Sequence, residues 1–250
     1  MTTLLVHGVP DTHRLWDRLR AELSRDDVEA VDLPGFGGPV PVGFTATKEE
    51  YLDWLVAEIE SIGEPVDVVG HDWGAILVQR LASVRPDLVR TWAAGGGPCD
   101  PGYEWHDVAK IWQTPGAGED FMTNWQPEVL QGMAGALGIP ADYAEGSAGF
   151  VDAVMKDCIL RLYRSAVDVS AEWGPDLRHA PAHALLIWGA DDPFVAAEIG
   201  VRSGVRVGGD VLVLEGCGHW WPLERPAEVA VALEKLWSGS TPTGSGRLVR

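Results

Sequence analysis

An aspartate stands where a sharp turn joins an apolar strand to a helix, and its position could make it a nucleophile. The stretch Val66–Val69 is apolar, and residues 70–74 (Gly-His-Asp-Trp-Gly) lead into a segment of helical period. Glycines at both ends of the turn are needed because backbone and helix come too close there for side chains. The pattern is typical of a nucleophile elbow, with Asp72 in place of the usual serine. Asp72 is expected to project from the carboxyl end of a strand, where ligands bind in open α/β sheets.

A carboxylate nucleophile implies a two-step reaction. It is ionised near neutral pH, so it can displace a leaving group from a saturated carbon without a base, and the product is an ester on the enzyme. Water must then cleave that ester, and this step needs a histidine as base, oriented by a second acid. The order nucleophile, acid, histidine is therefore predicted along the chain.

Both partners follow in that order, each at the end of an apolar strand. Residues 185–193 end in Gly-Ala-Asp-Asp-Pro, which offers Asp192 as the orienting acid and Asp191 as its solvated neighbour. His219 follows the last apolar strand. An isolated aspartate before a helix is more often an N-cap, and an isolated loop histidine is more often a surface residue. Here, however, all three residues occur in the predicted order and each follows an apolar strand, which favours catalytic roles for Asp72, Asp192 and His219.

Short apolar runs alternate with longer segments of helical period along most of the chain. This alternation predicts an α/β fold with a mostly parallel sheet of about six strands and helices on both faces. The expected strands are Thr3–Val6, Val28–Val31, Val66–Val69, Val89–Ala94, His183–Trp188 and Val211–Leu214, and the expected helices are Thr12–Leu23, Lys48–Ile62, Trp73–Val84 and Pro226–Trp237.

The alternation stops after the fourth expected strand, between Pro98 and Pro181. A structureless loop of that length is uncommon inside a compact domain, so we interpret the stretch as a helical cap with helices near Tyr103–Trp112 and Val151–Val167. The end of the chain has linker composition and is expected to be flexible. The predicted organisation is a core of residues 1–97 and 182–238, a cap of residues 98–181 and a tail of residues 239–250.

Composition argues against several classes of partner. The chain has 250 residues, 46% of them hydrophobic, and a formal net charge of −18. Nucleic acids and anionic membrane surfaces bind clustered Lys and Arg, so neither is expected as a partner. No apolar run approaches the roughly 20 residues that span a bilayer, and no leader is recognisable, which predicts a cytoplasmic location. Cys99, Cys158 and Cys217 show no disulfide or zinc-site pattern and are expected to be buried thiols.

These motifs resemble those of the α/β-hydrolase superfamily, and over most of the chain the likeness is to its soluble epoxide hydrolases. Residues 70–75 and 217–220 look like that family's nucleophile and histidine motifs, and residues 7–10 look like its oxyanion-hole motif. Haloalkane dehalogenases share the aspartate nucleophile. The resemblance implies that the backbone N–H groups of Val9 and Trp73 form the oxyanion hole, while His7 is expected to order its loop.

The epoxide hydrolases use two cap tyrosines to help the epoxide oxygen leave, and one of them has a match here. Residues 162–165 resemble the second tyrosine's motif, which makes Tyr163 the expected proton donor, although a half-buried packing role is the alternative. The Gln-x-Pro-Gly sequence at 113–116 places the first tyrosine at Val108, and a valine cannot donate a proton.

Two tryptophans are the expected substitutes for the missing tyrosine. Trp105 and Trp112 lie three residues before and four residues after position 108, on the same face of a helix, so an indole N–H could donate there. Packing in the cap is the alternative for both, and His106 is a weaker candidate. Trp105, Val108, Trp112 and Trp220 are the expected substrate contacts.

The leading hypothesis is an epoxide hydrolase that forms an ester on Asp72 and releases a vicinal diol. It needs no cofactor or metal ion, uses water as the second substrate, and takes a small apolar or aromatic epoxide because the predicted cap is rich in tryptophan. The alternative is a haloalkane dehalogenase with the same acids and histidine, in which Trp73 and Trp112 would bind the halide. A ligand-binding scaffold without turnover is the second alternative, and the sequence leaves a homo-oligomer open.

Overall fold

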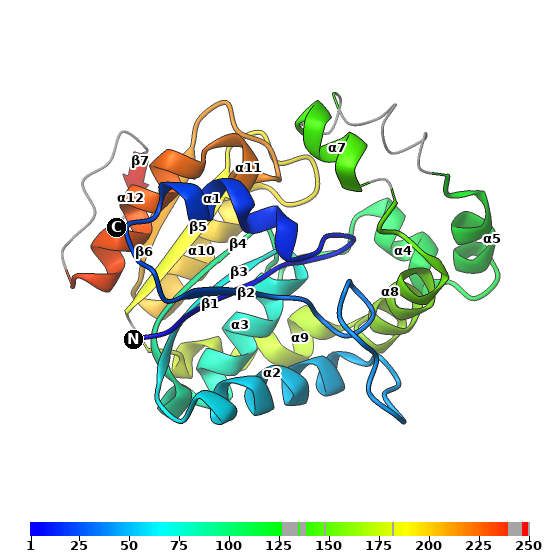
Figure 1. Cartoon of the computed structure of the whole chain (residues 1–250), viewed down its shortest axis with the longest axis horizontal. Coiled ribbons are helices and arrows are strands. Elements are labelled where there is room, and N and C mark those ends of the chain that lie inside the picture. The colour runs from blue at the N-terminus through cyan, green and yellow to red at the C-terminus, as the bar shows by residue number, and fades with distance from the viewer. Residues whose placement is uncertain (127–134, 136–138, 148, 182, 240–246, 250) are drawn as a thin grey trace.

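A seven-stranded sheet forms the centre of the molecule (Figure 1). The structure is a computed structural model that describes residues 1–126, 135, 139–147, 149–181, 183–239 and 247–249. The strand order is β2-β1-β3-β4-β5-β6-β7, and the first six strands are parallel, so the α/β-hydrolase fold and the six predicted strands are confirmed. The strands are β1 Thr3–Val6, β2 Val28–Val31, β3 Val66–His71, β4 Val89–Gly95, β5 Ala184–Gly189, β6 Asp210–Leu214 and β7 Arg247–Val249.

The seventh strand lies in the region where a flexible tail is expected from composition. β7 pairs antiparallel with β6, with Leu248 opposite Leu212. Residues 247–249 thus form a strand at the edge of the sheet, and residues 240–246 of the expected tail lie outside the described part. Composition is a poor guide there because an edge strand offers backbone N–H and C=O groups to any extended segment, whatever its side chains.

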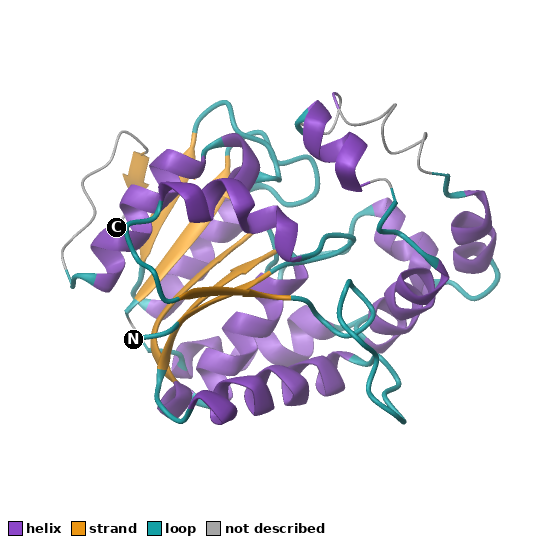
Figure 2. Ribbon diagram, in the orientation of Figure 1, coloured by secondary structure: helices purple, strands orange, loops and turns teal. Residues whose placement is uncertain are grey.

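Two layers of helices cover the two faces of the sheet (Figure 2). Alternate residues of β1 face opposite layers, with Leu4 and Val6 in one apolar cluster and Leu5 in the other, as the period of a strand requires. One layer contains η1 His13–Trp16, α1 Asp17–Glu22, α11 Trp221–Glu224 and α12 Pro226–Trp237, and the other contains α2 Lys48–Ile62, α3 Trp73–Val84 and α10 Ala197–Val207, while the short η2 Pro86–Leu88 leads into β4.

The chain between β4 and β5 contains a stretch called here the inserted segment (residues 98–181), whose described part is largely helical; its helices from α4 to α8 lie beyond the carboxyl ends of the strands, and its last part, α9 and η3, returns along α3 (Figure 1). The helix expected at Tyr103–Trp112 begins later, at Asp107, because the His106 side chain accepts the backbone N–H of Ala109 and caps it. The described helices of the segment are α4 Asp107–Gln113, α5 Ala117–Asn124, α7 Ala141–Ser147, α8 Ala153–Ser165, α9 Val169–Trp173 and η3 Gly174–His179.

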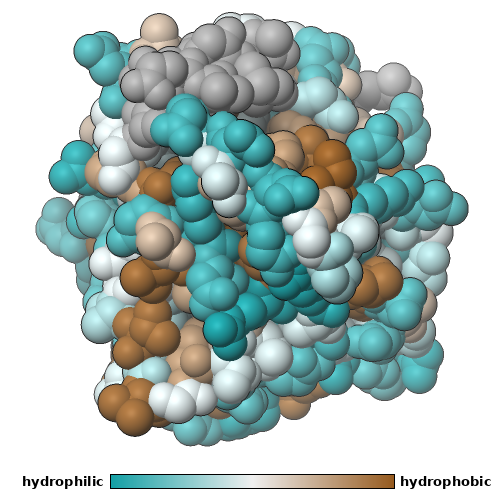
Figure 3. All heavy atoms as spheres, turned by 90° about the vertical axis from the view of Figure 1, so that its right-hand side faces the viewer, coloured by the Kyte–Doolittle hydropathy of each residue, from teal (hydrophilic) through white to brown (hydrophobic). Residues whose placement is uncertain are grey.

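The outer surface of the molecule on the side of the inserted segment is mixed in character. Figure 3 shows hydrophobic side chains in small separate groups among hydrophilic ones on this side. Single exposed apolar residues are normal on a protein surface. Within the described residues, every helix is too short or too polar to cross a bilayer.

Candidate active site

Asp72 occupies the turn between β3 and α3. Its backbone has a φ of 52° and a ψ of −119°, a conformation that residues other than glycine rarely adopt. A Cβ on Gly70 would overlap the backbone of Gly74, and a Cβ on Gly74 would overlap the carbonyl oxygen of Val6. The turn therefore requires glycine at both positions, and it fixes the direction in which the Asp72 side chain leaves the sheet.

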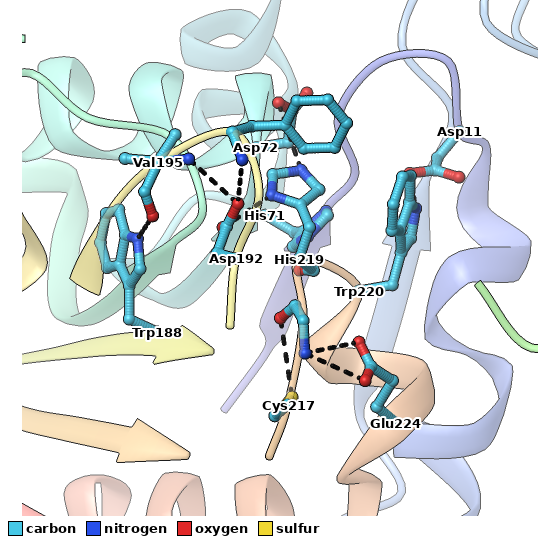
Figure 4. Close-up of polar contacts among 12 residues, drawn as sticks. Asp11, His71, Asp72, Trp188, Asp192, Val195, Cys217, His219, Trp220 and Glu224 are labelled. Carbon is cyan, nitrogen blue, oxygen red and sulfur yellow. Dashed lines mark hydrogen bonds and ion pairs between the residues drawn. The ribbon is translucent and has the colours of Figure 1, made fainter. Parts of the chain in front are cut away.

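The structure brings Asp72, His219 and Asp192 together. His219 Nδ1 lies 2.8 Å from Asp192 Oδ2, and His219 Nε2 lies 3.6 Å from Asp72 Oδ2. The second Asp192 oxygen accepts two backbone N–H groups, of residues 194 and 195, at 2.8 and 3.0 Å. Figure 4 shows Asp192 with Val195 on one side of His219. Because Asp192 occupies the Nδ1 edge, the ring presents Nε2 to Asp72.

Mutual charge sets the protonation of this group. Burial by itself lowers the pKa of His219, but the charges and hydrogen bonds of Asp192 and Asp72 outweigh burial and raise the pKa to about 10. Burial raises the pKa of Asp72, but the hydrogen bond and charge of His219 outweigh that effect and bring it below its usual range. In the free protein at neutral pH, His219 is therefore an imidazolium between two carboxylates.

The loop after β1 supplies a backbone donor to the Asp72 carboxylate. The Val9 N–H donates to Asp72 Oδ1 over 2.7 Å. Trp73, the other expected donor, begins α3, and the first N–H groups of a helix have no partner within the helix. His7 Nδ1 donates to the neighbouring carbonyl and its Nε2 accepts the Leu33 N–H, while burial lowers the pKa of His7 to about 4. His7 is thus a neutral ring that holds the loop.

A second histidine, His71, holds the backbone of His219, and the sequence analysis did not identify it. Its Nε2 lies 2.9 Å from the carbonyl oxygen of His219. Burial, reinforced by the charge of His219, lowers the pKa of His71 to about 3, so the ring is neutral and its Nε2–H donates. The Glu224 carboxylate accepts the N–H of Gly218 on the same loop. The main chain and the side chain of His219 are therefore both fixed.

A cavity of about 740 Å³ opens over the Asp72 carboxylate, between the sheet and the inserted segment. Most of its wall is apolar or aromatic, and Asp72, His219, Tyr163 and His106 contribute polar atoms near its floor and wall. Three of the four expected substrate contacts lie on the wall. The described lining residues are Val9, Pro10, Asp72, His106, Val108, Ile111, Trp112, Ala117, Asp120, Phe121, Asn124, Trp125, Tyr163, Phe194, His219 and Trp220.

Tyr163 reaches the cavity from α8. Its ring stands edge-on to the rings of Trp73 and Trp112, with centroids 5.4 and 4.8 Å away. Within the described chain the hydroxyl group of Tyr163 makes no hydrogen bond of good geometry. Its oxygen is also not completely covered by protein atoms. Burial and the charge of Asp72 raise the pKa of Tyr163 well above its usual value, so it is a protonated phenol.

Trp105 does not fulfil the role expected of it. It precedes the first residue of α4, so it does not share a helix face with Val108 and Trp112. Its indole N–H donates to the carbonyl oxygen of Ala166 over 2.9 Å, and its ring stacks on that of Trp73 behind the described cavity wall. Helical spacing failed here because the helix begins only after the residue in question.

The remaining groups that could bind metal are dispersed. Cys99, Cys158 and Cys217 are free and buried, as expected. Among the residues that the structure describes, no three His, Cys, Asp or Glu side chains are placed to hold a metal ion.

A family model described as the alpha/beta hydrolase family matches residues 3–232. That range includes the elbow, both partners of Asp72 and the whole inserted segment. The chain belongs to the alpha/beta hydrolase family. The sheet order and the strained nucleophile turn of this hydrolase agree with the match.

Two relatives cover nearly the whole of this hydrolase. The (E)-2-((N-methylformamido)methylene)succinate hydrolase of Acinetobacter baylyi is 24% identical over 242 residues, 96% of this chain and 90% of that protein. Epoxide hydrolase A of Mycobacterium tuberculosis is 24% identical over an alignment of 289 residues, 94% of this chain and 90% of that protein. A solved haloalkane dehalogenase from Bradyrhizobium elkani, 22% identical, has a TM-score of 0.78 and covers 96% of this chain and 91% of its own. This last likeness shows the fold alone.

A buried carboxyl group of this hydrolase, Asp11, lies beside the site and was also missed by sequence reasoning. It accepts the hydroxyl of Tyr143 on α7 over 2.8 Å and the indole N–H of Trp220 over 3.3 Å. Figure 4 shows Asp11 beside Trp220. Burial raises its pKa to about 6, against the opposing effect of the Tyr143 hydrogen bond. Asp11 therefore connects the loop after β1 with the inserted segment and the cavity wall.

Asp11→Asn is expected to stabilise this hydrolase at pH 8 more than at pH 4. An acid with a raised folded pKa contributes stability fully below its unfolded pKa, here 3.8, and loses it as the pH rises through about 6. Between pH 4 and pH 8 the parent thus loses up to about 3 kcal/mol of stability relative to the variant. Any loss where the amide of the variant meets the Trp220 N–H is the same at both pH values and cancels from this difference. Thermal unfolding of both proteins from pH 4 to pH 8 measures the difference, and a difference independent of pH would contradict the assignment.

Proposed function

We propose that this hydrolase opens an epoxide to a vicinal diol through a covalent ester on Asp72. The observation that carries the proposal is a phenol, Tyr163, on the wall of the cavity that also contains Asp72 and His219. Two-step epoxide hydrolysis needs three groups: a nucleophile, a proton donor for the leaving alkoxide and a base for water. The likeness to Epoxide hydrolase A supports this choice at low identity.

In the first step the Asp72 carboxylate attacks one epoxide carbon. The carbon–oxygen bond of the ring breaks, its electron pair stays on the oxygen, and the Tyr163 hydroxyl gives that oxygen a proton. The products are a hydroxyalkyl ester of Asp72 and a tyrosinate. Because Asp72 lies within an apolar cavity and is ionised by its pairing with His219, it is ready to attack without a general base.

Ester formation changes the role of His219. The neutral ester no longer contributes the charge that helped to raise the pKa of His219, so that pKa falls and the ring can give its proton to the Tyr163 phenolate. A neutral imidazole oriented by Asp192 is then present only when there is an ester to cleave. His219 thus becomes a base at the point in the cycle where one is needed.

In the second step His219 takes a proton from water, and the hydroxide adds to the carbonyl carbon of the Asp72 ester. The Val9 N–H already bonds an Asp72 oxygen, and with the Trp73 N–H it would stabilise the oxyanion. Collapse expels the diol oxygen, which takes the proton from His219. The carboxylic acid left on Asp72 then returns its proton to His219, which restores the starting state.

The cavity wall favours an apolar or aromatic substrate. We assign residues 98–181 as a cap over a core of residues 1–97 and 182–238, with the substrate held between them. Parallel rings of Trp112 and Trp125, with centroids 5.8 Å apart, and the ring of Phe121 give the cap side an aromatic lining, to which the core adds Phe194. Such a wall binds a phenyl or alkyl substituent better than a charged one.

One observation favours haloalkane dehalogenation as the second candidate. The indole N–H groups of Trp73 and Trp112 flank Tyr163 and have no hydrogen-bond partner among the described residues, and a halide site needs such donors. Both nitrogens are, however, fully covered by neighbouring atoms, whereas the Tyr163 hydroxyl is not. The open donor suits an alkoxide, so we prefer the epoxide.

A single turnover of styrene oxide in water labelled with heavy oxygen tests the proposal. Because hydroxide adds to the Asp72 ester carbonyl, we expect the label in the Asp72 carboxylate, detected by mass spectrometry of its peptide, together with phenylethanediol. Direct attack of water on the epoxide would place the label only in the diol and would overturn the ester route. Chloride release from 1-chlorohexane without diol formation would favour the dehalogenase, and binding without any adduct would favour a ligand-binding scaffold.

A further inference from the structure

The cavity of this hydrolase needs to stabilise a departing oxygen, and Tyr163 is one donor for it. Position 108, which also lies on the cavity wall, is a valine. The indole N–H groups nearby do not supply a second donor. The Trp105 N–H is bonded to Ala166, and the N–H groups of Trp73 and Trp112 are fully covered by protein.

His106, which caps α4, is a donor on the cavity wall. Its Nδ1 accepts the backbone N–H of Ala109 over 3.2 Å, so Nδ1 carries no proton. A neutral imidazole has one N–H, which must then be on Nε2. Nε2 has no hydrogen-bond partner among the described residues and is not one of the fully covered atoms, and the residue lines the cavity.

The surroundings of His106 keep it neutral and in place. Burial and the charge of His219 both lower the pKa of His106. Together they outweigh the charge of Asp72, which raises that pKa. The ring packs against Phe194, with centroids 5.0 Å apart, and Phe194 packs in turn against His219 at 5.1 Å. His106 is thus a fixed donor on the wall of the cavity that contains the nucleophile.

We propose that the Nε2–H of His106 is the second hydrogen-bond donor to the epoxide oxygen, acting together with Tyr163. The inference rests on the proposed epoxide chemistry. Tyr163 transfers its proton, while His106 keeps its own and donates a hydrogen bond to the oxygen as negative charge develops on it. No further acid or base is needed, and the valine at position 108 is then no obstacle to ring opening.

The test separates ring opening from ester hydrolysis in a variant that keeps the helix cap. His106→Asn retains an oxygen that can cap α4, because Asn is a favoured N-cap residue, but its shorter side chain does not reach into the cavity. We expect single-turnover ester formation from styrene oxide to slow by about 10²-fold, the usual effect of losing one donor to a developing oxyanion. Hydrolysis of the ester, measured in the same variant, should be unchanged.

Two comparison variants complete the design. His106→Phe retains the ring that packs on Phe194 and should slow ester formation to a similar extent, and Tyr163→Phe should slow the same step. Ester formation in His106→Asn at the parent rate would overturn the inference, as would equal slowing of both steps, which indicates a structural role. A parent protein that forms no ester on Asp72 would instead overturn the proposed function.

Discussion

Replacing Asp72 with Asn is expected to abolish both ester formation and diol production. The amide is a poor nucleophile, and single replacement of a residue that acts within a catalytic group commonly lowers turnover by about 10⁴-fold or more. The fold should survive, because Asn tolerates positive φ better than most residues and its oxygen can still accept the Val9 N–H. Diol formation and intact-protein mass after incubation with styrene oxide measure the effect.

The neighbouring acids offer a matched control for this experiment. Asp191 is exposed, and no hydrogen bond joins its side chain to His219 in the described structure, so Asp191→Asn should retain parent turnover. Mass spectrometry of the peptide that carries the Asp72→Asn substitution verifies that the amide has not reverted to the acid. Substantial diol formation by an intact Asp72→Asn protein would show that water attacks the epoxide directly, contrary to the proposed ester.

Local patterns in the sequence were sufficient for the elements that carry Asp72 and for the order of its partners. The bounds of β1, β2, α2, α3 and α12 agree with the expectation, because each strand is a short, mainly apolar run and each helix is a longer segment whose apolar residues recur at helical spacing. The elbow was predictable for a related reason. Gly70 is required by its close contact with Gly74 inside the same turn, so half of the signal is local, whereas Gly74 is required by its contact with the distant Val6 and is recognised only as part of the motif.

Features that depend on distant contacts could not be predicted in this way. The role of Asp11 arises from Tyr143, more than a hundred residues away, and no spacing rule relates the two. α10 was missed because Gly200 and Gly204 weaken its helical pattern. Glycine is needed at these two positions because the helix packs closely against Trp188 and Val211 of the neighbouring strands. The donor role proposed for His106 depends on which ring edge caps α4, a question only coordinates can answer.

His219→Gln is expected to trap the ester that Asp72→Asn prevents. Loss of a general base commonly lowers the rate of the step it assists by about 10²- to 10⁴-fold. Here that step is hydrolysis of the ester, because ester formation needs no base. We expect a rapid burst of one ester per protein, followed by very slow diol release. Acid quenching and mass spectrometry of the Asp72 peptide over time measure both phases, and a variant that releases diol at the parent rate without accumulating ester would exclude His219 as the base.

The pH dependence of ester formation in His219→Gln tests how the pairing with His219 affects the ionisation of Asp72. In the parent, His219 holds the pKa of Asp72 below its usual range against the effect of burial. Glutamine carries no charge, so it cannot offset the effect of burial as His219 does. The pKa of Asp72 is therefore expected to rise in the variant. Only ionised Asp72 attacks the epoxide. When the pH is lowered, ester formation should therefore begin to slow at a higher pH in His219→Gln than in the parent. An unshifted profile would mean that the Val9 N–H, which the variant retains, keeps Asp72 ionised without help from the imidazolium.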